Sequence, residues 1–125
     1  MKAPLIAIVD DDEAVCTGIT SLMRSLGYDV QAYLSAEEFL GSAARRDTSC
    51  LISDVQMPGV GGLELQRILA AEGNPTPIIF ITAFPDAHVR QLALQAGALC
   101  FLSKPFDGEA LIQCLENALG AGGAH

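Results

Sequence analysis

The chain has 125 residues and a mass of 13.1 kDa, which is the size of a single domain. Half of its residues are apolar, 18% are charged and the mean hydropathy is +0.36, so a sizeable core is expected and intrinsic disorder is disfavoured. The formal net charge of -8 repels phosphate backbones and anionic lipids, which argues against direct binding to nucleic acid or to a membrane surface.

The N-terminal segment and the cysteines predict a cytoplasmic protein. Met-Lys-Ala-Pro precedes a short apolar stretch that Asp10 interrupts, so neither a secretory signal peptide nor a membrane span is expected. The cysteines, Cys16, Cys50, Cys100 and Cys114, are widely spaced and form no C-x-x-C motif. In a reducing compartment this spacing predicts free, mostly buried thiols rather than disulfides or a zinc site.

Short apolar stretches alternate with longer helical patterns along the whole chain. This order predicts a doubly wound α/β fold, (βα)5, with a central parallel sheet of five strands. The predicted strands are residues 5–9, 29–34, 50–53, 77–81 and 99–102. The predicted helices are residues 15–26, a short helix that opens at 35–38, and residues 63–72, 86–96 and 107–118. Gly27, Gly73 and Gly97 are the expected stop signals of three helices.

The C-terminal end differs in composition from the rest. After Leu119 the chain reads Gly-Ala-Gly-Gly-Ala-His, which offers almost nothing to bury. We therefore place one domain at residues 1–119 and a Gly-rich tail, or the start of a linker, at residues 120–125.

Polar side chains follow the predicted strands at the point where each strand ends. The acidic residues 10–13 follow the first strand, Asp54 follows the third, Thr82 the fourth and Lys104 the fifth. Parallel strands end at the same edge of a sheet, where open α/β sheets place their sites. The sequence therefore predicts that carboxylates, a hydroxyl and an ammonium face one crevice.

Each of these groups has an ordinary structural interpretation as well. The acidic residues 10–13 suit the positive N-terminus of the next helix. With Asp54 nearby, however, the carboxylates would repel unless a cation held them, and oxygen ligands suit Mg²⁺. Lys104 is expected to pair with Asp54, and it could later bind a phosphoryl oxygen on that residue. Thr82 is either a strand-end cap or a second phosphoryl contact.

Together these residues offer a carboxylate nucleophile, a metal site and two groups that receive negative oxygens. Phosphoryl transfer depends mainly on positioning and on neutralising charge at the transferred group. The residue set therefore predicts a chain that carries an aspartyl phosphate at Asp54.

The sequence resembles the receiver domain of two-component response regulators from residue 5 to about residue 119. The matching motifs are residues 8–11, 54–65, 80–83, 96–98 and 104–106. Met57-Pro58-Gly59 and residues 35–40 are most similar to the subfamily that includes the nitrogen-fixation regulator FixJ. The resemblance implies a flavodoxin-like fold of the CheY type, and a phosphorylation-controlled signalling module rather than a turnover enzyme.

The resemblance also implies roles for single residues. Asp54 would accept the phosphoryl group from the phosphohistidine of a sensor histidine kinase. Mg²⁺ would be held by Asp11, Asp54 and the backbone carbonyl of Gln56, with Asp10 acting through water.

Further residues would respond to the phosphoryl group. Thr82, Lys104 and the backbone N–H of Ala83 would contact its oxygens, and Phe101 stands at the position of the family's switch aromatic. Phe101 is equally interpretable as an ordinary strand aromatic. Lys104-Pro105 resembles the family's cis peptide, and on its own it indicates only a turn.

The expected partners follow from the family and from the fourth helix. That helix carries apolar residues on two faces, which predicts that Val89 and Leu92 lie in a partner face. The family often dimerises or docks effectors through the fourth helix, fifth strand and fifth helix. A DNA-binding effector for transcription regulation would lie beyond this chain, or the chain would act alone in a phosphorelay.

Two other functions compete with this interpretation. Asp10-Asp11-Asp12 formally satisfies the Asp-x-Asp motif of haloacid-dehalogenase-type phosphatases. Such enzymes need a further acidic motif late in the chain, whereas the late acids here lie at or within a predicted helix. The second alternative is a receiver that works only as a docking module and accepts no phosphate.

Overall fold

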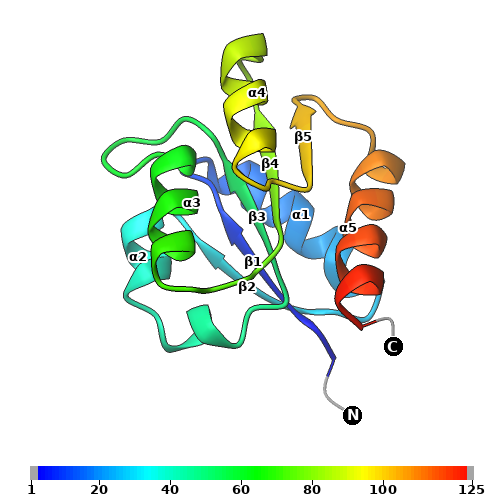
Figure 1. Cartoon of the computed structure of the whole chain (residues 1–125). Coiled ribbons are helices and arrows are strands. Elements are labelled where there is room, and N and C mark those ends of the chain that lie inside the picture. Colours follow the sequence, from blue (N-terminus) through cyan, green and yellow to red (C-terminus); the bar gives the residue numbers. More distant parts are fainter. Residues whose placement is uncertain (1–2, 124–125) are drawn as a thin grey trace.

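The computed structural model describes residues 3–123. Five strands and the helices between them alternate along the chain, as the sequence predicts (Figure 1). The strands are β1 (Leu5–Val9), β2 (Asp29–Tyr33), β3 (Cys50–Asp54), β4 (Ile78–Thr82) and β5 (Cys100–Ser103). The helices are α1 (Glu13–Ser25), α2 (Ala36–Leu40), α3 (Gly62–Ala71), α4 (Ala87–Gln95) and α5 (Gly108–Gly123), with the 3-10 helix η1 (Ala43–Arg46) after α2.

All neighbouring strands pair in parallel, in the order β2-β1-β3-β4-β5. The chain runs from β1 outward to β2, then crosses to β3 on the other side of β1. In a doubly wound sheet, this reversal point is where side chains beyond the strand ends have room to form a site. The predicted doubly wound α/β fold with five parallel strands is confirmed.

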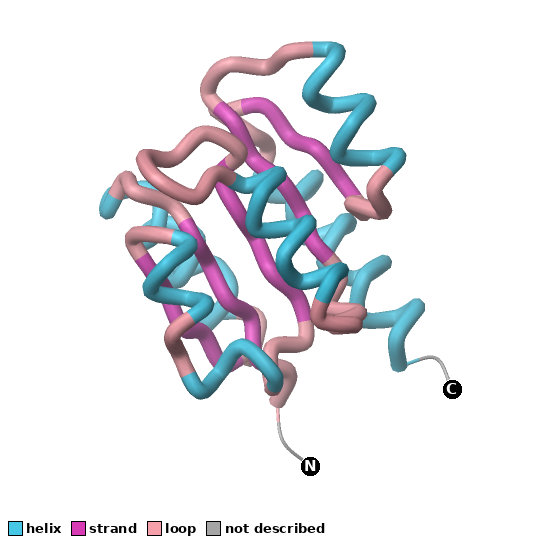
Figure 2. The backbone as a smooth tube through the Cα atoms, turned by 60° about the vertical axis from the view of Figure 1, so that its left-hand side comes forward, coloured by secondary structure: helices cyan, strands magenta, loops and turns pink. Residues whose placement is uncertain are grey.

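Two helical layers cover the sheet. Helices α1 and α5 lie on one face, and α2, α3 and α4 lie on the other (Figure 1; Figure 2 gives a second view). Ile6 and Ile8 of β1 pack toward α1 and α5, whereas Ala7 and Val9 pack toward α2 and α3. Successive side chains of a strand point to opposite faces, so a strand covered on both sides is apolar throughout.

The helix ends follow the local signals. Asp12 and Asp86 cap α1 and α4 with side-chain oxygens that accept backbone N–H groups, and Ser35 does the same for α2. The glycines after α1, α3 and α4 all have a positive φ, which ends a helix at low cost. These residues are Gly27, Gly73 and Gly97.

The fifth helix extends beyond the expected domain boundary. It runs through Gly123, so residues 120–123 of the predicted tail are helical, and Ala124 and His125 lie outside the described residues. The domain boundary at Leu119 stays a prediction. Within residues 3–123, no helix is long and apolar enough to cross a membrane.

The prediction of free thiols is wrong for two of the four cysteines. Cys100 of β5 and Cys114 of α5 form a disulfide, with Cα atoms 6.3 Å apart and a sequence separation of 14. Cys16 and Cys50 are free and buried, as predicted. A separation of 14 matches no cysteine motif, because this contact depends on how α5 packs against β5 rather than on local spacing.

Candidate functional site

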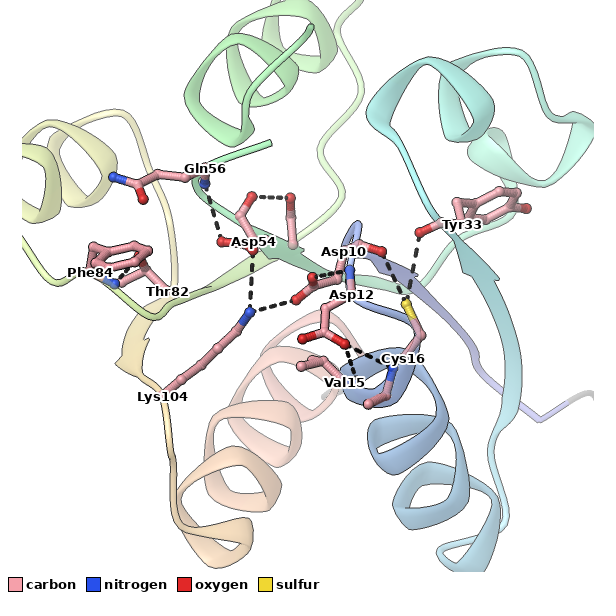
Figure 3. Close-up of polar contacts among 12 residues, drawn as sticks. Asp10, Asp12, Val15, Cys16, Tyr33, Asp54, Gln56, Thr82, Phe84 and Lys104 are labelled. Carbon is pink, nitrogen blue, oxygen red and sulfur yellow. Dashed lines mark hydrogen bonds and ion pairs between the residues drawn. The ribbon is translucent and has the colours of Figure 1, made fainter. Parts of the chain in front are cut away.

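Four polar side chains gather at the carboxyl edge of the sheet (Figure 3). Asp10 directly follows β1, and Asp54 is the last residue of β3. Thr82 ends β4, and Lys104 follows β5. Asp10, Asp54 and Thr82 are 0%, 6% and 1% exposed, although aspartate is rarely buried unless it is paired. The strand-end residues that the sequence singles out are therefore together in space.

Asp10, Asp11 and Asp54 form a group that we call the acidic cluster. One carboxylate oxygen from each lies within 4.8 Å of the others. Asp10 and Asp54 are buried and Asp11 is exposed, so the cluster opens to solvent at Asp11. Its donors are all oxygen atoms, which fit Mg²⁺, and no nitrogen or sulfur donor of the cluster selects a softer metal.

Lys104 joins two members of the acidic cluster. Its Nζ atom donates to Oδ2 of Asp10 at 2.8 Å and to Oδ2 of Asp54 at 3.2 Å. The backbone N–H of Lys104 donates to the carbonyl of Thr82 at 2.7 Å, which fixes the start of the following loop. The Lys104-Pro105 peptide is cis. The expected pairing with Asp54 is present, and the contact with Asp10 is shorter.

The ionisation of the site follows from burial and from these contacts. Burial raises the pKa of Asp10 above its ordinary value, and the charge on Asp54 adds to the rise, although hydrogen bonds from Lys104 and from the Asp12 N–H oppose it. Burial alone would lower the pKa of Lys104, but the contacts with Asp10 and Asp54 outweigh burial and raise it. One ammonium faces three carboxylates, so the excess negative charge favours a further cation.

The acidic residues after β1 divide into two roles. Asp12 is the N-cap of α1, and its Oδ1 accepts from the N–H groups of Ala14 at 2.9 Å and Val15 at 3.4 Å. Its own N–H donates to Oδ1 of Asp10 at 2.9 Å. The helix-capping interpretation therefore holds for Asp12, whereas Asp10 and Asp11 belong to the acidic cluster.

The loop after Asp54 begins with a tight turn. The N–H of Gln56 donates to Oδ1 of Asp54 at 3.1 Å, and the N–H of Gly62 donates back to the carbonyl of Val55 at 2.9 Å. A Cβ at Gly62 would lie 2.5 Å from the carbonyl oxygen of Asp54 and 2.9 Å from a ring carbon of Phe80. Close packing under Asp54 therefore requires a glycine at position 62. The sequence alone does not indicate this requirement, because it depends on the tertiary contact with Phe80.

A second contact of this loop comes from α2. Glu37 Oε2 accepts from the backbone N–H of Val60 at 3.3 Å. Gly59, just before it, has φ of +75° and passes directly against the Glu37 carboxylate. The sequence gives no sign of this contact, because Glu37 and Val60 are 23 residues apart along the chain.

The side chain of Thr82 is hydrogen-bonded to the backbone of Phe84, which borders the site. Its Oγ1 accepts from the N–H of Phe84 at 3.1 Å, which leaves its hydroxyl hydrogen free to be donated. The ring of Phe84 is 70% exposed, and Gln56 is also exposed. Ala83 lies between Thr82 and Phe84 and is exposed. Figure 3 shows Phe84 beside Thr82, on the same side of the site as Gln56.

The expected switch and partner residues lie on β5 and α4. Phe101 is half-buried, and its ring centroid is 6.5 Å from that of Phe80. Leu92 is 43% exposed and lines a groove of about 420 Å³ between α3 and α4, together with Leu63. Val89 is half-buried against the core on the same helix. The Leu92 side chain is therefore accessible to a partner, whereas the Val89 side chain packs partly against the core.

Comparison with known proteins decides the family. The family model of the response regulator receiver domain matches residues 6–116. The chain is a response regulator receiver domain. This assignment fits the parallel sheet and the strand-end site, and it gives no support to the phosphatase alternative.

Characterised relatives of this receiver domain are two-component regulators. It is 42% identical over 118 residues to the response regulator protein TodT of Pseudomonas putida, a match that covers 94% of this chain and 52% of TodT. It is 37% identical over 115 residues to the transcriptional regulatory protein FixJ of Azorhizobium caulinodans, covering 92% of this chain and 54% of FixJ. The chain thus spans about half the length of the relatives it matches.

The solved structures agree with the sequence relatives. The receiver domain superposes on the crystal structure of FixJ-N with a TM-score of 0.84 and 34% identity, covering 95% of each chain. It also superposes on the response regulator StyR with a TM-score of 0.87 and 40% identity, covering 95% of this chain and 60% of StyR. The similarity to the FixJ subfamily is therefore confirmed in sequence and in fold.

Proposed function

We propose that Asp54 of this receiver domain accepts a phosphoryl group from the phosphohistidine of a sensor histidine kinase, and that phosphorylation changes a partner face. The observation that carries the proposal is the position of Asp54, which lies within the acidic cluster and 3.2 Å from the Lys104 ammonium. Phosphoryl transfer needs a positioned nucleophile and groups that neutralise developing charge. Both are present at this carboxylate.

The transfer step needs a fixed carboxylate. An oxygen of Asp54 attacks phosphorus, the O–P bond forms as the N–P bond to the kinase imidazole breaks, and the electron pair of that bond stays on the imidazole nitrogen. The N–H of Gln56 and the ammonium of Lys104 each hold one oxygen of Asp54, at 3.1 and 3.2 Å. Because these groups belong to the chain itself, it catalyses its own phosphorylation without being a turnover enzyme.

Mg²⁺ is the proposed cofactor. Asp11, Asp54 and the backbone carbonyl of Gln56 would hold it, with Asp10 acting through water. Bound there, it would neutralise charge on the phosphoryl oxygens. The excess of three carboxylates over one ammonium supports this assignment, because a divalent cation relieves their repulsion.

The phosphoryl group would then create contacts that the resting state lacks. Lys104 would pair with one of its oxygens, and the hydroxyl of Thr82 and the N–H of Ala83 would donate to others. Interactions made only in the phosphorylated state shift the balance between two conformations. Phe101 is the proposed switch aromatic, since it is half-buried near Phe80 and lies on β5, the strand that Lys104 follows.

The partners are inferred from the relatives and from α4. We propose that this receiver domain works in the cytoplasm with a sensor histidine kinase, and that a DNA-binding effector lies outside this chain, since its relative FixJ is a transcriptional regulatory protein. The proposed partner face, for a homodimer or an effector, comprises α4, β5 and α5 and includes Val89 and Leu92.

The partner face is tested by substitution. Changing Val89 and Leu92 to polar residues (Val89→Thr with Leu92→Gln) should abolish self-association or effector binding, and Leu26→Gln is the control at another exposed leucine. Unchanged association of the double variant contradicts the proposed face.

The phosphoacceptor is tested by intact mass. Wild-type protein, Asp54→Asn and the control Asp47→Asn, an exposed aspartate, are incubated with acetyl phosphate or phosphoramidate, with and without Mg²⁺. We expect one phosphoryl adduct on the wild type and on Asp47→Asn, only when Mg²⁺ is present, and none on Asp54→Asn.

Two results contradict the proposal. An adduct on folded Asp54→Asn places the acceptor elsewhere. The second is a wild-type protein that is folded and binds Mg²⁺ but forms no adduct with either phosphoryl donor. That result favours a receiver that works only as a docking module.

A further inference from the structure

The disulfide between Cys100 and Cys114 joins a strand to the helix that covers it. Cys100 is the first residue of β5, and Cys114 lies on the inner face of α5. Their Cα atoms are 6.3 Å apart, within the usual range for a disulfide. Both side chains pack against the core between the sheet and the α1–α5 layer. The link therefore ties α5 to the edge strand of the sheet.

The segment enclosed by the disulfide contains part of the functional site. Lys104, Pro105 and Phe106 lie between the two cysteines along the chain, and Phe101 lies next to Cys100. Lys104, Pro105 and Phe106 also line a groove of about 600 Å³ against α1. Opening the disulfide removes the covalent link between the two ends of the segment that carries Lys104, which are then held only by the pairing of β5 with β4 and by the packing of α5.

The other two thiols do not compete for this link. Burial raises the pKa of Cys50 to about 12, and burial with the charge of Asp10 raises that of Cys16 to about 11. Thiol–disulfide exchange needs the thiolate, so both thiols are unreactive near neutral pH. The cysteine chemistry of the folded chain is thus confined to one pair.

We propose that Cys100 and Cys114 form a reversible thiol–disulfide site that a low-molecular-weight disulfide closes and a dithiol opens, and that its state sets how firmly α5 is held against β5. The site is a covalent modification separate from phosphorylation, and it does not rest on the proposed role of Asp54. Exchange starts at Cys100, which is half-buried, rather than at Cys114, which is 8% exposed.

The exchange balances with the reagents named. A thiolate of the dithiol attacks Sγ of Cys100, the S–S bond breaks, and Cys114 leaves as a thiolate that takes up a proton. The second thiol of the reagent then attacks the mixed disulfide and releases Cys100 as a thiol. Two electrons pass from the dithiol to the protein, and the dithiol becomes a cyclic disulfide. In closure by oxidised glutathione, the Cys100 thiolate attacks the glutathione disulfide and one glutathione leaves. The Cys114 thiolate then attacks Sγ of Cys100 in the mixed disulfide and releases the second glutathione, so the two electrons pass from the protein to glutathione.

Opening the link should loosen the chain locally. The closed ring spans a sequence separation of 14. Closing a loop of this length restricts the unfolded chain, so reduction should lower Tm by about 5–10 °C. Amide exchange should rise in residues 100–119, whereas exchange in α1 should stay as it is.

The first test is thiol trapping of the folded protein. Protein equilibrated with oxidised glutathione or with dithiothreitol, a dithiol, is freed of the reagent and alkylated with iodoacetamide, and modified peptides are identified by mass. We expect Cys100 and Cys114 to be linked in the oxidised buffer and alkylated together in the reduced buffer, with Cys16 and Cys50 unmodified in both. Recovery of Cys100 and Cys114 as unlinked thiols in the oxidised buffer overturns the proposal.

The second test separates the link from side-chain packing. Cys114→Ala removes the link, and the double variant Cys16→Ala with Cys50→Ala is the matched control that keeps it. Reduction should lower Tm and raise exchange in residues 100–119 for wild type and for the control, but not for Cys114→Ala. The wild type is tested in both redox states, so the result holds even where a variant folds poorly. Identical Tm and exchange of oxidised and reduced wild type overturn the proposal.

Discussion

The ammonium of Lys104 lies closer to Asp10 than to Asp54, with Nζ to Oδ2 distances of 2.8 and 3.2 Å. Asp10 is fully buried and its pKa is raised by burial, so its ionised form is costly in the folded protein. Lys104 offsets part of that cost while it also faces the proposed phosphoacceptor. The same side chain therefore stabilises the resting fold and contacts the proposed phosphoacceptor.

Replacing Lys104 with methionine should destabilise the fold at neutral pH. The change leaves the acidic cluster without its cation, which we expect to cost about 1–3 kcal/mol of unfolding free energy. It should also tighten Mg²⁺ binding, since no ammonium competes for the carboxylates. Urea unfolding and titration calorimetry measure the two effects. Arg67→Met is the control, because Arg67 pairs with Glu64 on an exposed helix surface and should matter little.

The cost of Lys104→Met should depend on pH in one direction. The folded-state pKa of Asp10 lies above its unfolded value, so ionisation of Asp10 lowers stability as pH rises from about 4. The Lys104 hydrogen bond lowers this pKa, so its removal enlarges the loss. The difference between variant and wild type should thus be small at acidic pH and grow toward neutral pH. A difference that is constant with pH would assign the effect to packing.

Gly62→Ala should be strongly destabilising. The new Cβ would lie 2.5 Å from the Asp54 carbonyl oxygen and 2.9 Å from Cα of Val55, and both are backbone atoms that cannot rotate away. We expect a loss of about 3 kcal/mol, with a shifted Asp54. Gly18→Ala is the control: Gly18 lies inside α1 with no atom within 4 Å of the new Cβ, and the change should stabilise by about 0.5–1 kcal/mol. Equal effects in denaturant unfolding would contradict the close packing.

Most of the fold could be predicted because parallel strands covered on both faces are apolar at every position. Residues 5–9 (LIAIV) and 78–81 (IIFI) show this pattern, and each observed strand end lies within one residue of the predicted one. Gly27 and Gly73 end their helices as predicted. Residues 120–123 were expected to form a tail, but they continue α5. A glycine weakens a helix by only about 1 kcal/mol, so an established helix continues through such residues when no proline stops it.

The residues that gather at the strand ends could be predicted from the sequence, and so could the Lys104–Asp54 pair, but the remaining contacts could not. Chain order alone places Asp10, Asp54, Thr82 and Lys104 at one sheet edge. The nearer partner of Lys104, the packing of Gly62 and the disulfide all depend on side chains that are distant in sequence. No local pattern encodes those distances, so the expected free thiols at Cys100 and Cys114 were the natural prediction from spacing.

Alkaline pH should expose the burial of Cys50. The unfolded chain loses this thiol proton near pH 9, whereas the folded chain retains it until about pH 12. The raised folded pKa means that stability is complete below pH 9 and declines above it, by about 2–3 kcal/mol at pH 11. Urea unfolding between pH 8 and pH 11 should show a smaller decline for Cys50→Ala than for wild type. If the stability of wild type and of Cys50→Ala declined in parallel with pH, the Cys50 thiol would ionise alike in the folded and unfolded states.

Phe84→Ala should shorten the lifetime of a phosphoryl group on Asp54. The Phe84 ring is 70% exposed beside Thr82, whose Oγ1 accepts from the Phe84 N–H at 3.1 Å, a backbone bond that the substitution retains. Unfolding free energy should change by less than about 0.5 kcal/mol, since little of the ring is buried. Dephosphorylation, followed by intact mass, should be faster by roughly several-fold, because water reaches the site more freely. Leu26→Ala removes another exposed apolar side chain, at the end of α1, and should leave the rate unchanged. An unchanged or longer lifetime in Phe84→Ala would mean that the ring does not shield the acyl phosphate, and that Gln56 or the Mg²⁺ ligands control access instead.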